Sequence, residues 1–169
     1  MLKFISKNTI SSPVSSVILT GINSTNPYLL TFNDVVSASD SKQFTIRVTA
    51  SGSAKTTSDY DQTLKTMSPV AGFGNQGNTN NSSWLSSTFS SGNGTGESDN
   101  GLVYLYHFNN SSEYSFCTYE VVKVQLTPYL VGEIGGGVYT VAEAHDGIEV
   151  RYDDGTNIAS GTFALYEIL

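Results

Sequence analysis

Cysteine, charge and long apolar runs are all scarce in this chain of 169 residues. Cys117 is the only cysteine, which excludes an intrachain disulfide and a cysteine-rich metal site. Charged residues make up 14% of the chain, against about 25% in an average soluble domain. No segment reaches the roughly 18 apolar residues of a membrane span, and the first residues lack the apolar stretch of a signal peptide. We therefore expect that the chain does not insert into a membrane and that it is made in the cytoplasm.

Basic residues are scarcer than acidic ones, with eight Lys and Arg against fifteen Asp and Glu and a net charge of −7. A protein that binds nucleic acid needs a basic face to neutralise phosphates, so nucleic acid is not an expected partner. Residues 97–169 carry eleven of the fifteen acids, whereas residues 1–96 carry six of the eight cations. This asymmetry predicts that the C-terminal half faces solvent and the N-terminal half lies nearer an attachment point.

Hydroxyl, amide and glycine residues take the place of charge, since Ser, Thr, Asn and Gly account for 71 residues. Such residues disfavour long helices, while ten Tyr and eight Phe favour sheets. Residues 44–49 and 148–153 alternate apolar and polar side chains with the period of a half-buried strand. Weaker strand patterns, separated by polar turns, cover residues 14–22, 28–36, 102–108, 114–126 and 161–168. Together they predict an all-β fold, an antiparallel β-sandwich.

Two segments interrupt this rhythm. Residues 69–101 are rich in Gly, Asn and Ser and predict a long surface insert that is held at Trp84. Residues 58–67 predict one short helical turn at most. The strand pattern also predicts core residues, namely Phe44, Ile46, Val48, Ile148, Val150, Phe163 and Leu165.

Residues with catalytic or metal-binding potential form no recognisable constellation. Glutamates that a sugar-cleaving enzyme could use occur at positions 113, 120, 143 and 149, but their spacing selects no pair. Residues 153–157 offer oxygen ligands for Ca²⁺, although the same residues suit a tight hairpin turn, and we favour the turn. We therefore predict no catalytic residue, no cofactor and no metal site, and leave Ca²⁺ at this turn open.

The N-terminal residues 1–13 differ from the predicted domain, residues 14–169. Lys3 and Lys7 are cations with no acid before Asp34, and Phe4 and Ile5 lie outside the strand pattern. Apolar side chains on a positive tail favour docking over a free end. These four residues predict an arm that attaches the domain to a platform.

The amino-acid sequences of several predicted strands resemble those of a known group of proteins. The runs LTGINST (19–25), YLLTFNDVVSASD (28–40), FTIRVT (44–49) and SDYD (58–61) are similar to small virion structural proteins and fibre modules of tailed bacteriophages, frequent among phages of marine bacteria. GGGVY (135–139), DGIEVRY (146–152) and NIASGTFALYEI (157–168) resemble the closing strands of that family. The resemblance covers residues 14–66 and 135–169. Where those modules often have an Asp-Gly-Gly turn, this chain has SGSAKTT (51–57), so a contact of that turn is not carried over.

The resemblance implies a jelly-roll-like sandwich in a virion, without catalytic residues to carry over. We therefore expect a non-enzymatic projection or decoration protein, knob-like, on a capsid or tail, with other virion proteins as partners. Few charges between Thr31 and Ser58 leave strand edges unprotected, which predicts a homo-oligomer such as a trimer. The alternative is a receptor-recognition module of a phage fibre that binds host surface glycans. Its stacking residues would be Trp84, Tyr104, Tyr106 and Tyr129.

Overall fold

The computed structural model describes residues 1–84, 89–125 and 129–169, and the regular elements among them are all strands. No helix within these ranges is long and apolar enough to cross a membrane. The strands are β1 (Leu2–Ile10), β2 (Ser16–Thr20), β3 (Tyr28–Ser37), β4 (Phe44–Ala50), β5 (Ser53–Ala54), β6 (Tyr60–Ser68), β7 (Gly72–Asn81), β8 (Asp99–Tyr106), β9 (Ser115–Val124), β10 (Leu130–Tyr139), β11 (Gly147–Tyr152) and β12 (Ile158–Ile168).

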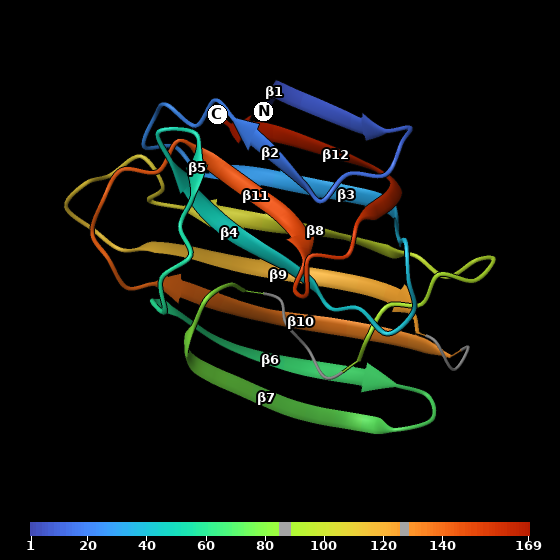
Figure 1. The fold of residues 1–169 in the computed structure, drawn as a ribbon. Coiled ribbons are helices and arrows are strands. Elements are labelled where there is room, and N and C mark those ends of the chain that lie inside the picture. The colour runs from blue at the N-terminus through green and yellow to red at the C-terminus, as the bar shows by residue number, and fades with distance from the viewer. Residues whose placement is uncertain (85–88, 126–128) are drawn as a thin grey trace.

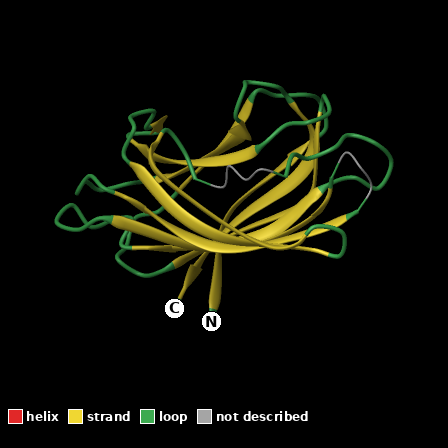
Figure 2. Cartoon of the chain, turned by 90° about the horizontal axis from the view of Figure 1, so that it is seen from below, coloured by secondary structure: helices red, strands yellow, loops and turns green. Residues whose placement is uncertain are grey.

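These strands form two antiparallel sheets that pack face to face (Figure 1). The larger sheet has eight strands in the order β1-β12-β3-β8-β9-β10-β6-β7, and the smaller has four in the order β2-β11-β4-β5. Figure 2 shows the larger sheet as a curved layer, with the smaller sheet on its inner side. The predicted all-β antiparallel sandwich is confirmed.

The core lies between the two sheets, where alternate side chains of each strand face inward. The ring of Phe44 on β4 stacks on Phe163 of β12 with centroids 6.3 Å apart, and it lies 4.9 Å from the ring of Phe32 on β3. These contacts join the small sheet to the large one. The predicted core is confirmed, because its residues are all buried: Phe44, Ile46, Val48, Ile148, Val150, Phe163 and Leu165.

The sequence predicts one short helical turn at most in residues 58–67 and misses the strand that they form. Strand β6 occupies Tyr60–Ser68, and buried side chains alternate along it with exposed or partly buried ones. Its inward residues include Gln62 and Thr66, which are polar. Because polar residues occupy some of its buried positions, β6 shows no regular alternation of apolar and polar residues, and the sequence therefore does not reveal the strand.

The expected surface insert at residues 69–101 contains ordered structure. Strand β7 pairs with β6 at the edge of the large sheet, and the chain then returns to the free edge of β4. There the Trp84 and Ile46 backbones exchange two hydrogen bonds of 2.9 and 3.0 Å, and Lys42 pairs with Ser91. Trp84 thus occupies the β4 edge at Ile46, and Ser91 pairs with Lys42 just before β4, so part of the edge from which oligomerisation was expected between Thr31 and Ser58 is covered.

The structure also differs from the expected arm at residues 1–13. Residues Leu2–Ile10 form β1, which pairs with β12 along nearly its whole length. The backbone hydrogen bonds of this pairing hold β1 as an edge strand of the sandwich, and a register shift between Phe4 and Ser6 hides its alternation. The N-terminal segment is therefore part of the domain.

Candidate functional site

The outer face of the large sheet is the broadest surface that no second layer of described residues covers (Figure 2). In β9, the side chains of Ser115, Cys117, Tyr119, Val121 and Lys123 are buried, and those between them are exposed. Strand β6 shows the same alternation, so both strands direct every second side chain outward. We call the outward surface of β8, β9, β10, β6 and β7 the outer face.

Strand β10 forms the floor of the outer face and is rich in glycine. A Cβ on Gly135 would lie 2.8 Å from the ring of Tyr119, and one on Gly137 would lie 2.6 Å from the ring of Trp84. These two glycines therefore allow large rings to pack against the inner side of the backbone. Gly132 and Gly136 lie at alternate positions of β10 that face outward. Because they have no side chain, the outer face has a depression at each of them, on either side of Ile134.

The depression at Gly136 is a shallow trough of about 550 Å³. Tyr106 and Phe116 line it on one side, and Asn78 and Thr79 of β7 line it on the other. The Tyr106 hydroxyl lies 3.4 Å from the Thr118 hydroxyl. A second depression of about 390 Å³ at Gly132 continues the hollow surface along β10. Large apolar side chains with at least 38% of their surface exposed lie at these depressions. Phe116 lines the trough, Met67, Val122 and Ile134 line the second depression, and Phe73 lies opposite Met67 on β7.

The predicted glycan-stacking residues are only partly brought together. Tyr104 and Tyr106 lie two residues apart on β8 and both line depressions of the outer face. Trp84 is fully buried, with its ring edge-on to Tyr60 at 5.2 Å, so the prediction that it stacks on a sugar is wrong. Tyr129 lies outside the outer face, 6.5 Å from the ring of Phe89. Sequence reasoning missed Phe116, whose place opposite Tyr106 in the β8 and β9 register becomes visible only with the pairing.

The predicted attachment residues have separate roles in β1. Lys3 forms a 2.8 Å ion pair with Glu167, and Ile5 packs against the core. The ring of Phe4 is 57% exposed and lies edge-on to Tyr166, while Lys7 is exposed. Lys3, Phe4 and Lys7 are therefore exposed to a partner, whereas Ile5 is partly buried against the core.

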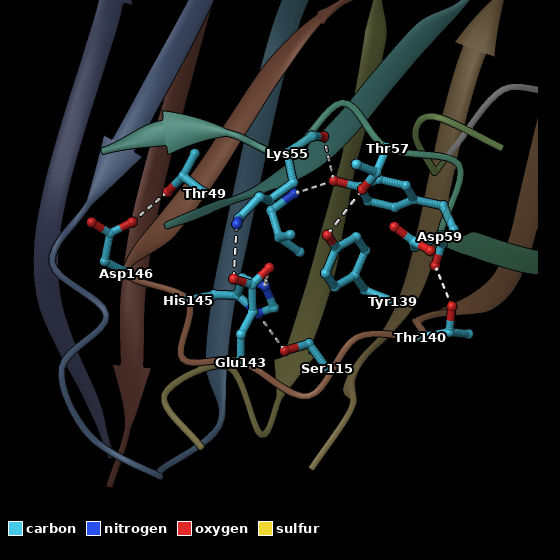
Figure 3. Close-up of polar contacts among 12 residues, drawn as sticks. Thr49, Lys55, Thr57, Asp59, Ser115, Tyr139, Thr140, Glu143, His145 and Asp146 are labelled. Atoms are coloured by element: carbon cyan, nitrogen blue, oxygen red, sulfur yellow. Dashed lines mark hydrogen bonds and ion pairs between the residues drawn. The ribbon is translucent and has the colours of Figure 1, made fainter. Parts of the chain in front are cut away.

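A polar network closes one end of the sandwich (Figure 3). The hydroxyl of Ser115 lies 2.7 Å from Nδ1 of His145, Nε2 of His145 lies 3.5 Å from Glu143, and Glu143 pairs with Lys55 at 2.8 Å. Burial lowers the pKa of His145. Burial raises the pKa of Glu143, but the hydrogen bond and charge of Lys55 outweigh this and lower it overall.

Serine, histidine and glutamate in this order resemble a hydrolase triad, but the geometry does not favour catalysis. Ser115 and His145 are both completely buried, so a substrate has no access to the hydroxyl. Nearby, Asp146 accepts hydrogen bonds of 2.7 Å from the Thr49 hydroxyl and the Gly52 amide, and so ties β4 to the segment before β11. The network therefore holds loops onto the sandwich end.

A second buried polar cluster lies at the start of β8. Oδ2 of Asp99 accepts hydrogen bonds from the Ser91 hydroxyl at 2.5 Å and from the Tyr152 hydroxyl at 3.1 Å. Burial raises the pKa of Asp99, against the opposing effect of Lys123. Lys123 in turn lies 3.4 Å from Glu133. Among the described residues, no three of His, Cys, Asp and Glu gather as metal ligands.

The remaining candidate carboxylates are held by separate partners. Glu113 pairs with His107 at 2.7 Å and Glu149 with Arg47 at 3.5 Å, whereas Glu120 lines the depression at Gly132. At the predicted turn, Asp154 accepts a 2.6 Å hydrogen bond from Lys42 and one of 2.9 Å from the Thr156 amide. Asp154 thus stabilises the turn and also pairs with the ammonium group of Lys42.

A scan of protein-family models, a search of curated proteins and a search of solved structures each return no match to this chain.

Proposed function

We propose that this chain is a non-enzymatic structural protein of a tailed-phage particle, a knob-like projection or decoration on the capsid or tail. One observation carries the proposal, namely the outer face with its exposed apolar side chains. Phe73 is 78% exposed, and Phe116, Val122, Ile134 and Met67 follow at 38–47%. Soluble monomers rarely expose apolar groups this close together unless the surface contacts a partner. In a virion, the partner is a neighbouring structural protein.

The composition and the resemblance of the strand sequences support the same proposal. Hydroxyl and amide groups keep a sheet protein hydrated with few charges, and fewer charges lower the cost of removing its surface from water on docking. The polar networks at Ser115 and Asp99 are buried and connect loops to sheets, and they serve the stability of the sandwich.

Immunogold electron microscopy tests the proposal. Antibody raised against the purified chain is applied to particles of the phage that encodes it, and particles of an unrelated phage serve as the control. We expect regular gold labelling at the capsid surface or along the tail. Labelling of the lysate debris without labelling of particles would contradict a structural role.

The trough at Gly136 favours a second candidate function, the binding of host surface glycans. Aromatic side chains flanked by hydroxyl and amide groups are the usual contacts for a sugar ring, and Tyr106, Phe116, Thr118 and Asn78 supply them. Replacing Tyr106→Ala should abolish binding on a glycan array, because the ring forms one wall of the trough. The matched control is Tyr166→Ala, which removes a partly exposed tyrosine of β12 away from the trough. An array without any bound glycan for the unmodified protein would exclude this candidate.

A further inference from the structure

Strand β7 is an outermost strand of the large sheet, and its residues 72–78 carry no charge, proline or bulge. The irregularity in its pairing with β6 lies beyond them, between the Gln62–Asn78 and Tyr60–Asn81 pairs. Sheet edges attract further strands unless charge, proline, a bulge or a covering segment blocks them. The free edge of β4 is covered at Ile46 by Trp84, and the free edge of β1 carries Lys3 and Lys7 and a bulge. Residues 72–81 contain neither a charged residue nor a proline, and among the described residues only β6 pairs with them.

The two ends of β7 differ in a complementary way, because one carries a large exposed ring at Phe73 and the other an open glycine at Gly77. Phe73 lies opposite Met67 in the β6 register and is the most exposed aromatic ring among the described residues, with Lys65 5.8 Å from its centroid. Gly77 lies opposite Thr63 and lines the trough of the outer face. Both positions have the same parity along the strand, so both belong to the outer face. A Cβ at Gly77 would lie no closer than 3.5 Å to any neighbour, so the surface above it is open.

We propose that two copies of this chain pair antiparallel through β7, centred on Asn75, and so form a two-fold dimer with one continuous sheet. In this register, Phe73 of each copy lies directly across from Gly77 of the other, next to the trough. An aromatic side chain placed over a cross-strand glycine covers the backbone that the glycine exposes. The contact occurs twice because the interface is isologous.

Charge also favours this edge as the contact. Each copy carries a net charge of −7, and eleven of its acids lie in residues 97–169. Strand β7 itself is uncharged, and its partner β6 carries only Asp61 and Lys65. Two copies can therefore meet here with less repulsion than at surfaces that carry the acids.

Light scattering of the full chain tests the dimer. The unmodified protein should have twice the chain mass of 18.1 kDa at high concentration and dissociate on dilution. Asn75→Lys should give a monomer under the same conditions, because it places two like charges opposite each other at the axis. Asn8→Lys makes the same change on the opposite edge, β1, and should leave the dimer intact. A strict monomer for the unmodified chain, or equal masses for both variants, would overturn the proposal.

Disulfide trapping tests the register. Asn75→Cys places two thiols directly across the axis, so mild oxidation should convert most of the protein to a covalent dimer. Gln76→Cys moves the thiol one residue along, to the other face and away from its symmetry mate, and should crosslink much less. The unmodified protein should not crosslink, since Cys117 is buried. Stronger crosslinking at position 76 than at 75 would contradict the register. Gold labelling of particles is independent of these results, so a failed dimer and a failed virion role are distinguishable.

Discussion

Ile46 occupies the point where the small sheet, the large sheet and the segment after β7 meet. Its side chain is completely buried, and both of its backbone groups bond to Trp84. Ile46→Ala should therefore lower the free energy of unfolding by about 2–5 kcal/mol, the usual cost of truncating a buried aliphatic residue.

Ile18→Ala is the matched control, because Ile18 on β2 is 41% exposed and loses less apolar burial. Chemical denaturation of both variants measures the difference. Equal losses in the two variants would contradict the assigned facing of β4.

Glu167 predicts a pH dependence of stability. Hydrogen bonds from Lys3, Ser24 and Asn26 lower the pKa of Glu167 from 4.5 to about 2. A carboxyl group whose pKa is lower in the folded than in the unfolded chain stabilises the fold at pH values above the unfolded pKa. This stabilisation is lost as the pH falls toward the folded pKa. The contribution should therefore decline from pH 4.5 and vanish below pH 2.

Denaturation curves for the unmodified protein and Glu167→Gln measure this effect. The two should differ most above pH 4.5 and converge toward pH 2. If the difference in unfolding free energy between the two proteins stays constant from pH 4.5 to pH 2, the pKa of Glu167 is not lowered in the folded state.

Among single residues, the sequence predicted the core well and the outer face poorly. Ile46 and Val150 alternate with polar neighbours, so their burial follows from the strand period. Trp84 sits among Ser and Asn, and its burial depends on a cross-strand bond to β4 and on the space above Gly137. Contacts of this kind join residues distant in sequence, and no local pattern reveals them.

Strand β10 combines two tasks, because its inward glycines hold core rings and its outward glycines form the trough. Gly137→Ala would place a Cβ 2.6 Å from the Trp84 ring and 2.9 Å from the Asp61 carbonyl oxygen. Trp84 is the only tryptophan, so its fluorescence reports directly on this packing. We expect a lower melting temperature and a red-shifted emission maximum as water reaches the displaced ring.

Gly132→Ala lies on the same strand and faces outward, where a Cβ would meet only the flexible end of Met67 at 3.2 Å. Its emission spectrum should match that of the unmodified protein. A red shift in the control, or none in Gly137→Ala, would show that close packing at Trp84 does not require the glycine.

Elements with a clear apolar period could be predicted, and those without one could not. Strands β4 and β11 alternate apolar and polar residues in the sequence, and the apolar set of each lies in the core between the sheets. Strand β7 consists of Gly, Asn, Gln, Thr and a single Phe, so it has no apolar face to detect. It is a strand because β6 supplies hydrogen-bond partners, a tertiary effect that outweighs local propensity.

At the scale of the whole molecule, the N- and C-terminal halves are interleaved. The N-terminal amine of Met1 donates a 2.8 Å hydrogen bond to the backbone oxygen of Leu169, and both ends of the chain lie together in Figure 2. Strand β1 pairs with β12, and β6 pairs with β10. The expected orientation, with the N-terminal half at the platform and the acidic half outward, is therefore wrong, because the halves occupy no separate ends.

The central claim is that the outer face of the large sheet docks onto a neighbouring protein in a phage particle. A cryo-electron microscopy reconstruction of the particle tests this claim most directly. It should contain a sandwich with the dimensions of this fold, whose outer face, at Phe116 and Ile134, is buried against another virion protein. Particle density with this sandwich absent, or with its outer face open to solvent on every copy, would contradict the claim.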